Sequence, residues 1–123
     1  MRYLTDRKRA EGLGSANSGV HHFWAMKLTS VGLLVLIPVF IFMFGSMLGR
    51  PHAEVVAYFA RPFPALVAAL TIIVGFKHFR DGVQVLLEDY VHGTARTVWI
   101  ILLTCVSYGA MAAGLFAIAK IAL

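Results

Sequence analysis

The segment from Gly75 to Gly93 carries the side chains of this sequence that are best suited to chemistry. It reads GFKHFRDGVQVLLEDYVHG and places a histidine, several charged residues and a Glu-Asp-Tyr triplet in an otherwise apolar stretch. A charge near the centre of a bilayer costs roughly 3 kcal/mol even on the mildest insertion scale, so such residues normally face a cofactor, a water-filled cavity or a partner. We therefore expect the functional site in this segment.

His78 lies between two glycines on one side of the helix expected here. At about 100° per residue, Gly75 and Gly82 fall about 60° and 40° from His78. Thr71 and Asp89 each fall about 20° from it. The glycines leave room for a flat macrocycle to approach the backbone while the imidazole reaches its iron, as in helical haem sites. The same spacing also suits helix packing around a hydrogen-bonded imidazole, or a proton relay, and all three interpretations stay open.

The other histidines do not offer a second iron ligand on a matching helix. His21 and His22 precede the first long apolar run, and His52 and His92 fall in expected loops. Histidines at such positions are more typical of solvated or hydrogen-bonding groups than of iron ligands. Because one imidazole occupies only one side of an iron, a haem at His78 implies a histidine from a second chain.

Glu88, Asp89 and Tyr90 follow His78 by three helical turns. A phenol can donate a hydrogen bond to a carbonyl and a carboxylate can orient it or handle protons, which suits a quinone. The alternative is structural, since tyrosine commonly anchors a helix at a membrane interface and acids there can pair with nearby cations. Lys77 and Asp81 form an i, i+4 pair that reduces the cost of both charges.

The composition indicates a membrane protein. Of the 123 residues, 59% are hydrophobic and 14% are charged, with a mean hydropathy of +0.78. A water-soluble domain carries about 25% charged residues. Leu28 to Leu48 and Thr97 to Ala119 contain no charge, and roughly 20 apolar residues cross the hydrocarbon layer. We predict an all-α membrane protein with three transmembrane helices at about 24–48, 63–88 and 97–120, the middle one continuing through the charged segment.

The distribution of lysine and arginine predicts the orientation. These residues precede the first span and surround the second loop, which favours an inner N-terminus and an outer C-terminus. We interpret residues 1–22 as a polar cytoplasmic segment without signal cleavage. Asp6 and Glu11 disfavour a mitochondrial transit peptide, so we expect the bacterial inner membrane rather than the mitochondrial one. The net charge of +5 suits this topology and anionic lipid, and we expect no nucleic-acid partner.

Glycines recur in all three expected spans and offer surfaces for close helix approach. Three helices rarely enclose a site alone, so we expect a larger helical bundle that includes a second anchor protein. The single cysteine, Cys105, can form neither an internal disulfide nor an iron–sulfur site by itself.

Two stretches resemble the small hydrophobic membrane anchor of succinate dehydrogenase, respiratory complex II. The first runs from His78 to His92 in the pattern H-x-R-x-G-x-Q-x-x-x-E-D-Y-V-H, and is similar to the second-helix signature of that family. The second, Ser18 to Lys27, is similar to the segment that leads into the first helix. Three spans, an inner N-terminus and the chain length extend the resemblance over nearly the whole sequence.

The resemblance implies roles for five residues. It implies that His78 is an axial ligand of haem b, paired with a histidine of the other anchor protein. It implies that Tyr90 donates a hydrogen bond to a ubiquinone carbonyl, with Asp89 beside it among the groups that handle protons. Lys27 and His21 match positions near the haem propionates. A lysine there supplies a single positive charge but lacks the planar guanidinium group with which arginine forms two parallel hydrogen bonds.

The resemblance also implies the assembly and its activity. The chain is expected to bind haem b jointly with a second anchor, the cytochrome b subunit, to dock the iron–sulfur and flavoprotein subunits, and to complete the ubiquinone-reducing site. That activity belongs to the tricarboxylic acid cycle and aerobic electron transport, and the chain alone is not expected to catalyse it. The alternatives are a three-helix transporter or accessory protein with a proton path through His78, Asp81 and Asp89, and a fumarate reductase anchor.

Overall fold

The computed structural model describes residues 4–14 and 19–123 of the chain. These residues form helices and no strands. In chain order the helices are α1 (Asp6–Glu11), α2 (Gly19–Ser46), α3 (His52–Phe59), α4 (Pro62–Tyr90) and α5 (Gly93–Ala122). Within the expected polar segment 1–22, positions 1–3 and 15–18 lie outside the described residues.

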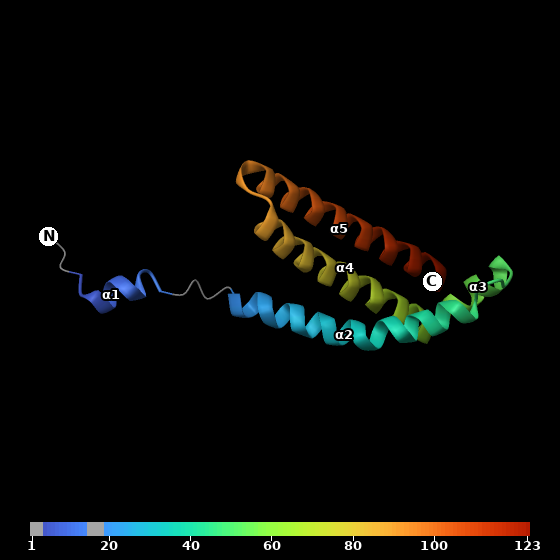
Figure 1. Cartoon of the computed structure of the whole chain (residues 1–123). Coiled ribbons are helices and arrows are strands. Elements are labelled where there is room, and N and C mark those ends of the chain that lie inside the picture. The colour runs from blue at the N-terminus through green and yellow to red at the C-terminus, as the bar shows by residue number, and fades with distance from the viewer. Residues whose placement is uncertain (1–3, 15–18) are drawn as a thin grey trace.

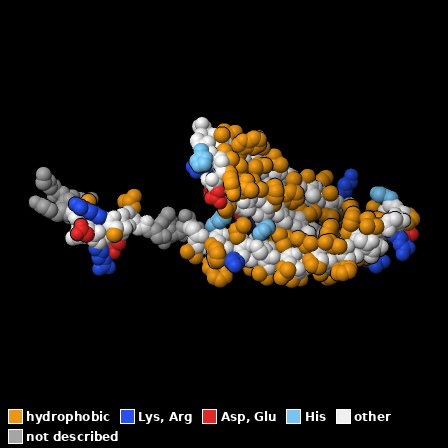
Figure 2. Space-filling view, in the orientation of Figure 1, with side chains coloured by type: hydrophobic (Ala, Val, Ile, Leu, Met, Phe, Trp, Pro, Cys, Tyr) orange, Lys and Arg blue, Asp and Glu red, His pale blue; other side chains and the backbone are white. Residues whose placement is uncertain are grey.

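Three of these helices, α2, α4 and α5, are long and apolar enough to cross a membrane. The 29 residues of α4 extend over about 43 Å at about 1.5 Å per residue, which exceeds the roughly 30 Å of hydrocarbon. Hydrophobic side chains cover most of the visible face of the three-helix unit, and charged ones gather toward its two ends (Figure 2). The chain is therefore an all-helical, multi-pass membrane protein, as the sequence predicted; its orientation and its place in a larger bundle stay predictions.

The central helix of the layer is α4, which packs against α2 on one side and α5 on the other (Figure 1). Within the described residues, α2 and α5 do not pack against each other. This single layer leaves a broad apolar surface, and α2 buries only Thr29 and Met43. Such a surface suits lipid or helices of another protein better than water.

Close contacts join α4 to both neighbours. A β-carbon added at Gly32 of α2 would lie 3.4 Å from the Val74 side chain, and one added at Gly114 of α5 would lie 3.2 Å from Ile72. Small residues at these positions let the helix backbones approach, as is usual in membrane helix packing. Gly45, by contrast, faces open space on this chain.

All three long helices begin before the spans expected from hydropathy, and α4 and α5 also end after them, whereas α2 ends at Ser46, before the expected 48. α2 begins at Gly19 and α5 at Gly93, because a helix continues into polar flanking residues that a count of apolar residues omits. Between α4 and α5 the connection is only Val91–His92, and Gly93 has a φ of 70°, a left-handed conformation that favours glycine. This short turn makes α4 and α5 antiparallel neighbours.

Candidate functional site

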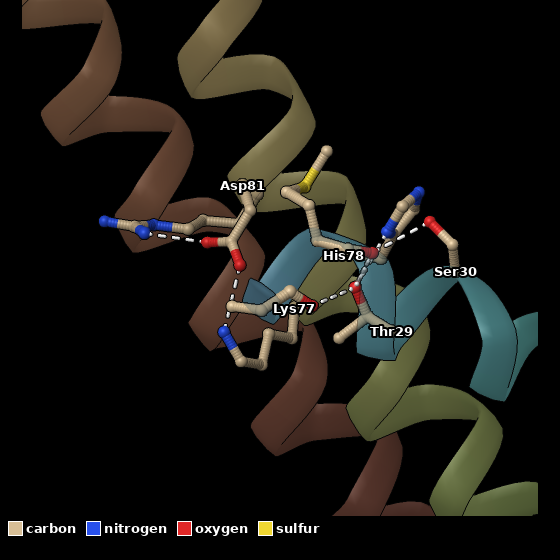
Figure 3. Close-up of polar contacts among 8 residues, drawn as sticks. Thr29, Ser30, Lys77, His78 and Asp81 are labelled. Atoms are coloured by element: carbon tan, nitrogen blue, oxygen red, sulfur yellow. Dashed lines mark hydrogen bonds and ion pairs between the residues drawn. The ribbon is translucent and has the colours of Figure 1, made fainter. Parts of the chain in front are cut away.

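His78 is held at the interface of α2 and α4. Its Nδ1 lies 2.9 Å from Oγ1 of Thr29, which projects from α2 (Figure 3). Thr29 is 7% exposed and His78 is half-buried, so the contact is largely shielded from the surroundings. The same threonine oxygen lies 2.9 Å from the carbonyl oxygen of Ala25 and 3.0 Å from that of Met26, both in its own helix.

An apolar cavity lies along α4 in the turns next to His78, although His78 itself does not line it. Its volume is about 430 Å³, and its lining consists of Phe40 from α2 together with α4 residues Ala68, Thr71, Ile72, Gly75, Phe76 and Phe79. A β-carbon added at Gly75 would meet no atom within 4 Å. An apolar cavity beside an imidazole and an open glycine are the features that one helix face must offer to a haem. The residues present therefore fit one half of such a site.

Donors from this chain alone do not complete a metal site. Among residues 4–14 and 19–123, no group of three or more histidine, cysteine, aspartate or glutamate side chains is close enough to hold a metal ion. Histidines 21, 52 and 92 are all exposed. A metal at His78 would therefore need further ligands that these residues do not supply.

Asp81, one turn after His78, is buried at 2% exposure and bonded to two cations. Lys77 Nζ lies 2.9 Å from Oδ2, and Arg80 Nη1 lies 2.8 Å from Oδ1. The spacing of Lys77 and Asp81 predicted the first pair, whereas the second pair joins adjacent residues and was not predicted. Because both oxygens are paired, the carboxylate is compensated inside α4 (Figure 3).

The side chains at the C-terminal end of α4 are far more open than those around His78 and Asp81. Tyr90 is 80% exposed, and Glu88 and Asp89 are also exposed. Gln84 Nε2 donates to Glu88 Oε1 over 2.8 Å. Neither Glu88 nor Asp89 forms a salt bridge within the described residues, so the cation pairing considered from sequence does not occur here.

A second cavity of about 360 Å³ lies between the beginning of α2 and the end of α4. It is lined by Gly19, His22, Gln84 and Glu88. The His22 Nε2 and Gln84 Oε1 atoms are buried without a hydrogen-bond partner among the described residues. The family resemblance implied a role for His21; the structure leaves His21 exposed, and His22 lines this cavity.

Lys27, the remaining sequence-predicted site residue, is exposed on α2 with its Nζ 5.5 Å from the centre of the Phe23 ring. Sequence reasoning missed Thr29, the partner of His78. Its only local signal was a threonine near the start of an apolar run, which does not reveal a contact across 49 positions of sequence.

Comparison with known proteins gives consistent matches. Residues 1–116 match the sequence model of the family described as succinate dehydrogenase/fumarate reductase transmembrane subunit. The succinate dehydrogenase hydrophobic membrane anchor subunit of Paracoccus denitrificans is 43% identical over 123 residues, which cover 100% of this chain and 95% of that protein. The protein of the same name from Rickettsia conorii is 27% identical over 97 residues, covering 76% of each chain. No solved structure matches the chain.

Proposed function

This chain belongs to the family of succinate dehydrogenase and fumarate reductase transmembrane subunits, and we propose that it anchors a succinate dehydrogenase in the bacterial inner membrane. The observation that carries the proposal is the 43% identity, over the whole chain, to an anchor protein of that name. Three helices of membrane length support it. In this role the chain serves the complex of the tricarboxylic acid cycle and aerobic electron transport without catalysing the dehydrogenation itself.

His78 is proposed as an axial ligand of haem b, opposite a histidine of the second anchor, the cytochrome b subunit. The support is the hydrogen bond to Nδ1, the neighbouring apolar cavity and the open position at Gly75. When bound, the haem supplies a one-electron carrier. Phe40, Phe76 and Phe79 line the cavity and exclude water from it. Lys27 and His21, nearer the inner end of α2, are proposed to neutralise the propionates.

Tyr90 and Asp89 are proposed to act at the ubiquinone. The exposed phenol at the end of α4 is free to donate a hydrogen bond to a quinone carbonyl, and the neighbouring carboxylate can pass protons toward it. Electrons reach this site from the iron–sulfur subunit, which receives them from the flavoprotein subunit. The open inner end of α4 suits the docking of those two proteins, because its tyrosine and aspartate side chains are not paired within the described residues.

The proton-path alternative gains less support. Both carboxylate oxygens of Asp81 are bonded to cations, Lys77 and Arg80, which disfavours a proton path through that residue. A fumarate reductase anchor would share the fold, and the names of the similar proteins favour succinate dehydrogenase.

The test is to purify the chain with its neighbours from the membrane, identify them by mass spectrometry and record a reduced-minus-oxidised visible spectrum. We expect three further subunits and haem b bands. His78→Ala should abolish those bands, whereas the matched control His52→Ala, at an exposed position in α3, should retain them. A complex without flavoprotein and iron–sulfur subunits would contradict the anchoring role, and a wild-type complex without haem bands would contradict the assignment of His78.

A further inference from the structure

We infer that Thr29 is a positioning residue for His78: its hydroxyl fixes the proton on Nδ1 of the imidazole and thereby leaves Nε2 as the unprotonated nitrogen that would be available to bind iron. The inference rests on the proposed haem-ligating function of His78. It concerns a residue of a different helix, 49 positions away in the sequence.

The hydroxyl of Thr29 has a single proton to donate. Thr29 Oγ1 has three polar neighbours, the carbonyl oxygens of Ala25 and Met26 at 2.9 and 3.0 Å and the Nδ1 of His78 at 2.9 Å. A carbonyl oxygen can only accept a hydrogen bond. The hydroxyl proton is therefore used within α2, and the oxygen can only accept from the imidazole.

The tautomer of His78 follows from this pattern. If Nδ1 carried no proton, Nδ1 and the two carbonyl oxygens would be three acceptors around the single hydroxyl proton. At least one contact would then bring two lone pairs together in a shielded position, with no hydrogen between them. With the proton on Nδ1, the imidazole donates to Thr29 and every contact is satisfied (Figure 3). A neutral imidazole has one protonated and one unprotonated nitrogen, so Nε2 is left with a free lone pair.

The surroundings make this hydrogen bond persistent. Thr29 is 7% exposed and lies within α2, a helix of membrane character, so water does not compete for its hydroxyl. Nearly one turn further along α2, a β-carbon added at Gly32 would lie 3.4 Å from the Val74 side chain, so the two helices pack closely beside the contact. A histidine that ligates a metal commonly donates its other N–H to a fixed acceptor, which orients the ring and raises its basicity.

The experiment compares Thr29→Val and Thr29→Ser in the complete, purified complex. Valine keeps the shape of threonine without the hydroxyl, whereas serine keeps the hydroxyl. We expect Thr29→Val to shift the haem midpoint potential to a more positive value, because an imidazole that no longer donates to an acceptor is a poorer electron donor to iron. We also expect altered low-spin g values in the oxidised state and haem loss to apomyoglobin faster by about tenfold or more. Thr29→Ser should behave as the wild type.

Ser30→Ala is the matched control. Ser30 is the next residue of α2, is exposed, and donates its hydroxyl proton to Met26 in its own helix over 2.8 Å. This variant removes a neighbouring hydroxyl without touching His78 and should leave potential, g values and haem retention unchanged. If Thr29→Val does not assemble, Thr29→Ala removes the hydroxyl without adding a methyl group in its place and gives the same readouts.

Two outcomes separate this inference from the proposed function. A wild-type complex that contains no haem would overturn both. A wild-type complex with haem, combined with an assembled Thr29→Val complex of unchanged potential and g values, would overturn only the role of Thr29. If the contact only packs α2 against α4, its loss would lower thermal stability and leave the midpoint potential and the g values unchanged.

Discussion

The polar side chains in the middle of α4 and those at its C-terminal end have opposite surroundings. In the middle, the Nδ1 of His78 is bonded to Thr29, and both carboxylate oxygens of Asp81 are bonded to cations of the same helix. At the C-terminal end, Tyr90 and Asp89 are exposed. The difference follows from solvent: a polar group in hydrocarbon must find its partner within the protein, whereas one at the membrane surface can remain open for a substrate or another protein.

The largest expected effect is at the open end. Tyr90→Phe removes a hydroxyl that makes no hydrogen bond to the described residues, so we expect unchanged stability of the complex. Because the lost donor would act on a carbonyl during reduction, quinone reduction should fall about 100-fold. The measurement is succinate:ubiquinone reductase activity, compared with succinate oxidation by an artificial acceptor. Equal loss of both activities would contradict a role at the quinone.

In the middle of α4, Asp81→Asn should lower the stability of the complex, which Tyr90→Phe is expected to leave unchanged. This change leaves Lys77 and Arg80 without their shared anion, at an expected cost of about 2 kcal/mol in stability. The value lies below that of a fully buried pair because Lys77 is partly exposed and can extend toward the headgroups. Thermal denaturation of the detergent-solubilised complex measures it. Lys77→Gln, which leaves the Arg80 pair intact, should cost less, and an equal cost would show that the two cations do not share the compensation of Asp81.

The smallest expected effect concerns the close packing between α4 and α5. Gly114→Ala would place a β-carbon 3.2 Å from Ile72, whereas Gly109→Ala on the same helix would meet no atom of this chain within 4 Å. Both variants gain the helix propensity of alanine, so the comparison isolates the contact. We expect Gly114→Ala to be less stable than Gly109→Ala by about 1 kcal/mol. Equal melting temperatures would indicate that Ile72 moves aside without cost.

Some of this organisation was accessible from the sequence. The uncharged runs 28–48 and 97–119 predicted two spans because hydrocarbon excludes charge over that length. The continuous apolar pattern beyond Lys77 and Asp81 predicted that one helix passes through the charged segment, and α4 runs from Pro62 to Tyr90 without a break. The motif from His78 to Tyr90 predicted the family, which the similar proteins confirm.

Other features depend on how the helices meet. Nothing local to Thr29 predicts that it faces His78 across 49 positions of sequence. Whether His21 or His22 lines the cavity between the beginning of α2 and the end of α4 depends on the rotation of α2 about its axis, and the pairing of Gly114 with Ile72 depends on the register of α5 against α4. Hydropathy constrains neither rotation nor register when most faces of a helix are apolar.

The sequence by itself therefore determined that this chain crosses the membrane three times and which family it belongs to, because span length, charge and a motif are properties of contiguous residues. Only the tertiary structure decided which polar groups find a partner on another helix and which stay free, because a hydrogen bond between helices requires two distant residues to meet at one depth and one rotation. The pairing of Thr29 with His78 and the openness of Tyr90 are features of that second kind.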